Sequence, residues 1–200
     1  MTMLEWAHGK FVFGRRVDVL RDHLADLIPL RANVLDVGCG DGRLAWSIQR
    51  IRGDVAIRGL DVLVRRRTYI EVDLFDGKRL PYPDESFDAV MAVDVLHHAE
   101  NPINLLSETA RVSRGVVLIK DHLADSWLAI PRLRLMDRVG NARYGVSLPY
   151  NYWTEERWRE AFGIIGLLPE VWRERLGLYP PPVSWVFDDS LHFIARLRRA

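Results

Sequence analysis

The stretch Val34-Leu35-Asp36-Val37-Gly38-Cys39-Gly40-Asp41-Gly42 decides how the fold of this chain is interpreted. It continues an apolar run over residues 32–37, which is typical of a strand buried on both faces of a sheet. Residues 43–50, directly after the glycines, have the pattern of a helix. A glycine-rich turn between a buried strand and a helix lets the backbone approach a ligand closely, because no side chain intervenes. The sequence therefore predicts a ligand-binding turn here.

Strand-like and helix-like segments alternate on both sides of this turn. Further strand candidates are residues 55–60, 69–72, 87–93, 115–120, 167–173 and 191–197. Apolar residues recur at helical spacing over residues 15–28, 102–112, 125–139 and 154–162, and the last segment begins with Thr154 as a predicted N-cap. The alternation predicts an α/β fold whose mostly parallel sheet has helices on both faces.

Four of the predicted strands end at or next to an aspartate, namely Asp36, Asp61, Asp94 and Asp121. In open α/β sheets, ligands bind beyond the carboxyl ends of the strands. A single aspartate there is a common strand terminator. Four of them predict an acidic ligand site along one edge of the sheet.

The glycine spacing and the nearby acids indicate what kind of ligand fits. The turn reads G-x-G-x-G, whereas dinucleotide-binding turns read G-x-G-x-x-G. Asp36 and Asp41 would repel a pyrophosphate, but they suit a ligand with a cationic amino group and a sulfonium. Asp61 lies about twenty residues after the glycines, where a carboxylate can bind both ribose hydroxyls. Asp76 could accept a hydrogen bond from an exocyclic adenine amine.

These segments together resemble a class I S-adenosylmethionine-dependent methyltransferase, of the group called methyltransferase type 11 or ubiquinone/menaquinone-methyltransferase-like. The residues that carry the resemblance are 34–42, Asp61, 80–84, 86–88 and 93–98. The resemblance is clear over residues 32–122. It implies a Rossmann-like three-layer sandwich with a seven-stranded, mostly parallel sheet and an antiparallel last strand. It also implies S-adenosyl-L-methionine as the cofactor and S-adenosyl-L-homocysteine as its product.

The resemblance also implies roles for individual residues. Gly38 and Gly40 would line the amino-acid part of the cofactor, Asp36 would place its amino group, and Val37 and Cys39 complete this set. A second set would surround the rest of the cofactor: Asp61 at the ribose, Asp76 at the adenine amine, Phe75 or Val62 against the ring, and the backbone near Asp94 and Val95 beside the methionine. The chain departs from the family between residues 61 and 69, where a full helix is usual and barely one turn fits.

Three histidines follow predicted strands and are candidate general bases. His97 and His98 follow the strand at 87–93, and His122 follows the strand at 115–120. A histidine pKa near ~6.5 suits proton transfer at neutral pH. Such a base is needed only if the acceptor atom carries a proton. The alternative is that the histidines only pack or form hydrogen bonds beside the methionine.

The segment after the strand at 115–120 is the predicted acceptor-binding insertion, residues 123–153, within a single domain of residues 1–200. It supplies aromatic side chains for a flat or apolar acceptor, namely Trp127, Tyr144, Tyr150, Tyr152 and Trp153. Some of these side chains would instead only pin the insertion to the sheet. An arginine-rich helix near residue 133 could contact an anionic lipid surface or a phosphorylated acceptor, although a solvated helix face is the interpretation that we favour.

Composition limits the function further. The chain has 200 residues, 48% of them hydrophobic, and a formal net charge of +1, which gives no long-range attraction to nucleic acid. One cysteine excludes an intrachain disulfide, and neither a signal peptide nor a membrane span is evident, so we expect a cytoplasmic protein. We predict no metal ligands, and the sequence does not indicate an oligomeric state.

The function we expect is methylation of oxygen, nitrogen or carbon on a small-molecule acceptor, aromatic or lipid-like. Two alternatives stay open. One is an RNA or protein methyltransferase, which the balanced charge disfavours. The other is a non-catalytic partner subunit that binds S-adenosylmethionine, which the complete set of turn glycines and acids disfavours.

Overall fold

The computed structural model describes residues 13–141, 149–188 and 190–200. The elements follow one another as α2 (Phe13–Leu27), β1 (Asn33–Val37), α3 (Arg43–Ile51), β2 (Ala56–Asp61), β3 (Val72–Leu74), β4 (Phe87–Val93), the 3-10 helix η2 (Leu96–His98), α4 (Pro102–Val112), β5 (Ser113–His122), α5 (Ala129–Asn141), α6 (Glu155–Ile165), β6 (Leu167–Glu174), α7 (Ser184–Phe187) and β7 (His192–Arg199). Within these residues, no helix combines the length and the apolar character that a membrane crossing requires.

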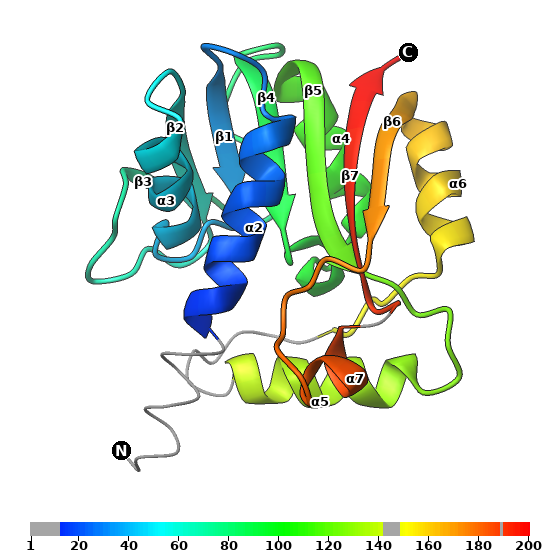
Figure 1. Cartoon of the computed structure of the whole chain (residues 1–200). Helices are drawn as coiled ribbons and strands as arrows, with labels where there is room; N and C mark the ends of the chain where they lie inside the picture. The colour runs from blue at the N-terminus through cyan, green and yellow to red at the C-terminus, as the bar shows by residue number, and fades with distance from the viewer. Residues whose placement is uncertain (1–12, 142–148, 189) are drawn as a thin grey trace.

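The strands form one seven-stranded sheet in the order β3-β2-β1-β4-β5-β7-β6. The strands from β3 to β5 run parallel, whereas β7 is antiparallel to both β5 and β6. The parallel strands all end at the lower edge of the sheet in Figure 1, where α5 and α7 lie. The expected Rossmann-like, mostly parallel sheet with an antiparallel last strand is confirmed.

Helices cover both faces of the sheet, and each face has its own apolar core. Leu35 of β1 packs with α4 and α6, while its neighbour Val34 packs with α2 and α3. Successive side chains of a strand point to opposite faces, so a central strand between two helical layers needs an unbroken apolar sequence. This explains the continuous apolar run that leads into the glycine turn.

Local sequence sets the starts of two helices. The Asn101 side chain accepts a hydrogen bond from the Asn104 backbone at 3.0 Å, and Pro102 occupies the first turn of α4. Thr154 caps α6 by accepting from the Arg157 backbone at 3.3 Å, as the sequence predicts. Both helices therefore begin where their capping residues place them.

The predicted third strand is wrong in its bounds. β3 covers Val72–Leu74, whereas the sequence suggested residues 69–72. Tyr69 and Ile70 are apolar for another reason: Ile70 packs against Gly42, and the Tyr69 backbone donates to the Asp41 carbonyl at 2.8 Å. Their apolar character serves the glycine turn instead of the sheet. No helix forms between β2 and β3, as the short spacing implied.

The layer below the sheet also differs in detail. α5 begins at Ala129, four residues later than predicted, and Pro131 lies in its first turn. The proline-rich segment after β6 includes the short helix α7, which contacts α5. A small apolar cluster of Ala129, Leu133 and Leu191 joins this layer to the start of β7. α5 thus lies across the edge where the predicted site residues gather.

Candidate functional site

The glycine turn is shaped by contacts on two sides and left open on the third. Gly38, Gly40 and Gly42 have positive φ angles of 70°, 62° and 75°, which glycine adopts without strain. A Cβ atom at Gly38 would overlap Val95, and one at Gly42 would overlap Ile70. A Cβ at Gly40 would meet no atom within 4 Å. The close approach to Val95 brings together two predicted cofactor residues, and the space at Gly40 leaves room for a ligand.

Two buried carboxylates lie beside this turn. Asp61 orders it by accepting hydrogen bonds from the backbones of Gly40 at 2.8 Å and Leu63 at 2.9 Å. Within the described residues, no hydrogen bond or ion pair engages the Asp36 carboxylate. Burial and the neighbouring Asp61 raise the pKa of Asp36 to about 8. A cationic group bound here would relieve this penalty, so the pair fits the predicted amino group and ribose.

The predicted adenine side is an open loop. Asp76 is exposed, and its Oδ1 atom accepts from the backbones of Lys78 at 2.8 Å and Arg79 at 3.0 Å. These two bonds lower the pKa of Asp76. A Cβ at Gly77 would lie 3.2 Å from the Val62 side chain, so the loop and the end of β2 are neighbours. The structure brings Val62 close to this loop. Phe75 directly follows β3, and its backbone N–H donates to the Asp61 carbonyl at the end of β2 at 3.2 Å.

Asp94, at the end of β4, lies in a group of buried charges. Its carboxylate pairs with Arg16 of α2 and with Lys120 of β5. Burial alone would raise the pKa of Asp94, but Arg16 and Lys120 outweigh it and hold the pKa well below its usual value. The φ angle of Asp94 is 56°, which is uncommon for a residue with a side chain. The side chain and backbone of Asp94 are therefore both fixed at this edge.

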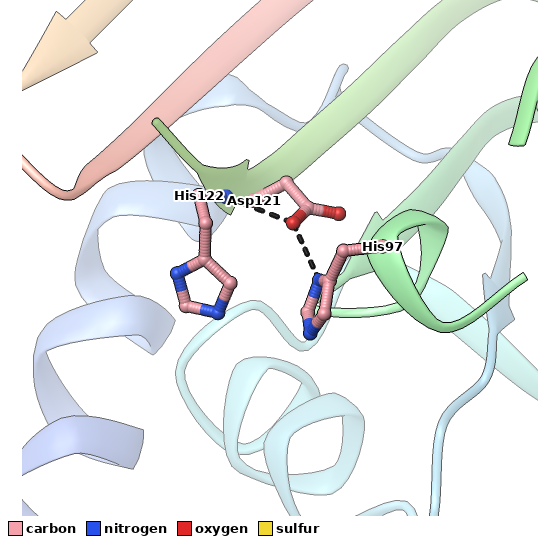
Figure 2. Close-up of side chains that lie close together, drawn as sticks. All are labelled: His97, Asp121 and His122. Atoms are coloured by element: carbon pink, nitrogen blue, oxygen red, sulfur yellow. Dashed lines mark hydrogen bonds and ion pairs between the residues drawn. The ribbon is translucent and has the colours of Figure 1, made fainter. Parts of the chain in front are cut away.

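His97 lies between two carboxylates. Its Nδ1 atom donates to Asp121 Oδ1 at 2.6 Å (Figure 2). Its Nε2 atom lies 3.4 Å from Asp137 Oδ2. Tyr152 also donates to Asp137. Burial would lower the pKa of His97, but the two carboxylates raise it to about 10. His97 is therefore cationic at neutral pH.

His122 is held next to His97 in a different charge state. The Asp121 Oδ1 atom that binds His97 also accepts from the His122 backbone at 2.8 Å (Figure 2). His192 Nε2 donates to the Phe187 carbonyl at 2.8 Å, so its Nδ1 is an acceptor, shared by Lys120 Nζ at 3.3 Å and His122 Nδ1 at 3.1 Å. His122 Nε2 then keeps its lone pair, 3.6 Å from Asp94 Oδ1. Burial and the nearby Lys120 and His97 hold the pKa of His122 well below its usual value.

His98 is the least constrained of the three histidines. Its ring centroid lies 3.9 Å from that of His97, and its Nδ1 atom is buried without a hydrogen-bond partner among the described residues. Burial and the cationic His97 lower the pKa of His98. His98 is therefore neutral at physiological pH.

The same cluster contains two groups of side chains that could bind a metal ion. Ligand atoms lie within 4.8 Å of one another in His97, Asp121 and His122, and likewise in His97, His98 and Asp137. His97 belongs to both groups. It donates to Asp121 and lies beside Asp137, so its positive charge offsets part of the negative charge of the two carboxylates. The hydrogen bonds account for the cluster as it stands.

The predicted acceptor aromatics separate into different environments. Tyr152 stacks on His97, with ring centroids 5.7 Å apart, and Tyr150 lies 6.0 Å from Tyr152. Trp153 packs on Trp158 of α6 and so helps to hold the segment on the sheet. Trp127 is exposed and belongs neither to the tyrosine pair nor to the packing of Trp153 on α6. Tyr144 lies outside the described residues.

Four charged or polar members of this site were not predicted from the sequence: Arg16, Lys120, Asp137 and His192. Only Lys120 left a signal, because Lys120-Asp121-His122 is a polar run at the end of an apolar strand. The other three come from α2, α5 and β7, elements that contain no predicted site residue. Their contribution follows only from the topology.

Comparisons with known proteins identify the family and the fold. A family model described as a methyltransferase domain matches residues 8–167, so the chain belongs to this family. The solved structure of a possible histamine N-methyltransferase from Thermotoga maritima has the same fold, with a TM-score of 0.67, 16% identity, and coverage of 98% of this chain and 95% of that one. The fold is therefore that of solved methyltransferases, one of them described as a SAM-dependent methyltransferase and another as a putative methyltransferase.

Two curated relatives show how broad the family is. The 27-O-demethylrifamycin SV methyltransferase of Amycolatopsis mediterranei is 34% identical over 110 residues, 48% of this chain and 40% of the relative. The phosphatidylethanolamine N-methyltransferase of Cereibacter sphaeroides is 33% identical over 135 residues, 60% of this chain and 65% of the relative. The matched region is thus less than two thirds of the length of each relative. Their acceptors differ, so likeness alone names no acceptor.

Proposed function

We propose that this enzyme methylates a small molecule at an oxygen or nitrogen atom that carries a proton. The observation that carries the proposal is the buried His122, whose Nε2 lone pair lies 3.6 Å from Asp94 Oδ1 at the predicted methionine side of the site. A base at this position is useful only if the acceptor must lose a proton. An acceptor that reacts at carbon without losing a proton there would have no need of it.

The turn and its acids would hold the cofactor. When bound, S-adenosylmethionine supplies an activated methyl group on a sulfonium. The open space at Gly40 admits its amino-acid part, and the ionised Asp36 would bind its amino group. Each carboxylate oxygen of Asp61 accepts one backbone hydrogen bond and keeps a lone pair for a ribose hydroxyl. Asp76, with Val62 and Phe75, would border the adenine.

His122 is the proposed general base. The bond from its Nδ1 to His192 fixes the tautomer, so Nε2 would accept the acceptor's proton. The resulting imidazolium would lie near the carboxylates of Asp94 and Asp137, at 3.6 and 4.0 Å, which would offset part of the penalty that burial, Lys120 and His97 impose on its positive charge. Typical gains from such a base are about 100- to 10,000-fold in rate.

His97 has a different proposed role, because a histidine that is already protonated accepts no proton. It would position Asp121 and Asp137, and through Asp137 the hydroxyl of Tyr152. Tyr150 and Tyr152 would then form one wall of the acceptor pocket. His98 is neutral and is the second candidate base.

A labelling experiment tests this function. The enzyme is incubated with methyl-labelled S-adenosylmethionine and, separately, with the small-molecule, RNA and protein fractions of a cell extract. Label in the small-molecule fraction, lost in His122→Ala, is the expected result. Label only in RNA or protein would overturn the proposed acceptor class. Cofactor binding without label in any fraction would favour the non-catalytic partner subunit.

A further inference from the structure

The outer face of α5 is apolar and basic at the same time. Ile130, Leu135 and the two arginines Arg134 and Arg138 are all exposed. At about 100° per residue, the four positions fall within one side of the helix. Ile130 is 45% exposed and Leu135 is 52% exposed. The opposite side, which includes Leu133, is buried against the molecule. The outer side therefore has no apolar partner among the described residues.

Two exposed tryptophans lie on segments next to this face. Trp127, in the turn before α5, is 89% exposed, and Trp185 of α7 is 72% exposed. α7 packs against α5 below the sheet (Figure 1). We name the exposed residues Trp127, Ile130, Arg134, Leu135, Arg138 and Trp185 the α5 face. Large exposed apolar side chains gathered in this way are typical of an interaction surface.

The two arginines of the α5 face have no carboxylate partner among the described residues. Arginines elsewhere on the surface, such as Arg58, Arg157 and Arg173, pair with carboxylates. Within the described residues, Arg134 and Arg138 form no ion pair, and Arg134 instead lies 5.5 Å from the Tyr150 ring centre. Their positive charge is therefore available to an external anion.

We propose that the α5 face binds the surface of an anionic lipid bilayer. Tryptophan and aliphatic side chains insert at the level of the lipid headgroups, while arginines beside them pair with headgroup phosphates. A solvated helix face needs the arginines but gives no reason for two largely exposed tryptophans. The face lies at the edge of the sheet where His97 and His122 are found, so a membrane-bound enzyme would have its site close to the lipid surface. The inference does not depend on which acceptor is methylated.

Vesicle sedimentation tests the proposal with two variants and a matched control. Arg134→Glu/Arg138→Glu reverses the charge, and Trp127→Ala/Trp185→Ala removes the apolar anchors. The control, Trp46→Ala/Arg50→Glu, changes the same residue types on α3, where Arg50 lies 5.7 Å from the Trp46 ring centre. Thermal unfolding of each variant verifies that it is folded.

Wild-type protein is expected to sediment with vesicles of phosphatidylcholine and phosphatidylglycerol, and much less with phosphatidylcholine alone. Added salt should weaken the binding. Each α5-face variant should lose about tenfold or more in affinity, while the control should stay within about twofold. Equal binding to both kinds of vesicle, or equal loss in the control, would overturn the proposal. Binding to RNA without binding to vesicles would also overturn it.

Discussion

The Nδ1 atom of His122 lies 3.1 Å from the Nδ1 atom of His192, whose other ring nitrogen donates to the Phe187 carbonyl. Only one of the two facing nitrogens can donate. Since His192 uses its proton at Phe187, its Nδ1 atom accepts from both Lys120 and His122. The Nε2 atom of His122 then faces Asp94 and Asp137 without a proton. Two histidines seventy residues apart thus fix which atom of the site can act as a base.

Replacing His122 with alanine should lower kcat by about 100- to 10,000-fold, because the acceptor's proton then has no fixed destination. Binding of S-adenosylhomocysteine should change by less than about threefold, since His122 is not among the predicted cofactor residues. Turnover of the acceptor found in the labelling experiment measures kcat, and calorimetry measures the affinity for S-adenosylhomocysteine. His23→Ala on α2 is the control, because its ring contacts only the Leu176 carbonyl among the described residues. Unchanged turnover of His122→Ala from pH 6 to pH 9 would remove His122 as the base.

The charge on His97 predicts a pH-dependent stability. Its pKa of about 10 in the folded protein lies above the usual 6.5, so its stabilising contribution is complete below pH 6.5 and is lost as the pH rises toward 10. His97→Gln leaves two carboxylates without their cation, and should lower the free energy of unfolding by about 3 kcal/mol at pH 6.5. That difference should shrink at pH 10. Urea unfolding of both proteins at the two pH values measures it, and a difference independent of pH would contradict the assignment.

Asp36 predicts a pH-dependent affinity. In the free protein its pKa is about 8, because burial and Asp61 disfavour the carboxylate. A bound amino group favours the ionised form, so affinity for S-adenosylhomocysteine should increase from pH 6 to pH 8, by at most about tenfold per pH unit. Asp36→Asn should bind more weakly and without this increase. The raised pKa also means that the free wild-type protein loses stability as the pH rises toward 8, and Asp36→Asn should not. Calorimetry at three pH values measures the affinity for S-adenosylhomocysteine. The same pH dependence in wild type and Asp36→Asn would refute the role of Asp36.

The two glycines Gly40 and Gly166 offer a matched pair. Both have positive φ angles, 62° and 75°, and a Cβ at either would meet no atom within 4 Å. Alanine at either position should therefore cost about 1 kcal/mol of stability through backbone strain alone. Only Gly40→Ala should weaken cofactor binding, by about tenfold or more, because its Cβ enters the space proposed for the ligand. Equal affinities of the two variants would mean that the cofactor does not approach Gly40.

The sequence predicts the fold best where the signal is local. The bounds of β4 and α4 match the prediction at both ends, because β4 is an apolar run between polar residues, and α4 begins at a cap followed by a proline. The apolar residues 69 and 70 misled the prediction of β3, because they pack on the glycine turn. A short apolar run does not reveal which surface it covers.

The site residues likewise divide into those that a local motif predicts and those that only the fold brings in. The turn residues and Asp61 are visible in the sequence because a motif of fixed spacing carries them. Asp137 and His192 are not, since each belongs to an element whose own pattern is only helical or strand-like. Arg16 reaches Asp94 across 78 residues of chain. The charge state of each histidine follows from these distant partners, so it could not be read from the sequence.

The central claim is that the acids around the glycine turn hold S-adenosylmethionine, and Asp61 tests it most directly. The measurement is calorimetric binding of S-adenosylhomocysteine to wild type, Asp61→Asn and Asp54→Asn. Asp54 is the control because it too accepts a backbone hydrogen bond, from Arg31 at 2.9 Å, but lies away from the turn. The account predicts that Asp61→Asn weakens binding by about tenfold or more while the protein remains folded, and that Asp54→Asn binds like wild type. Wild-type affinity in folded Asp61→Asn would contradict it.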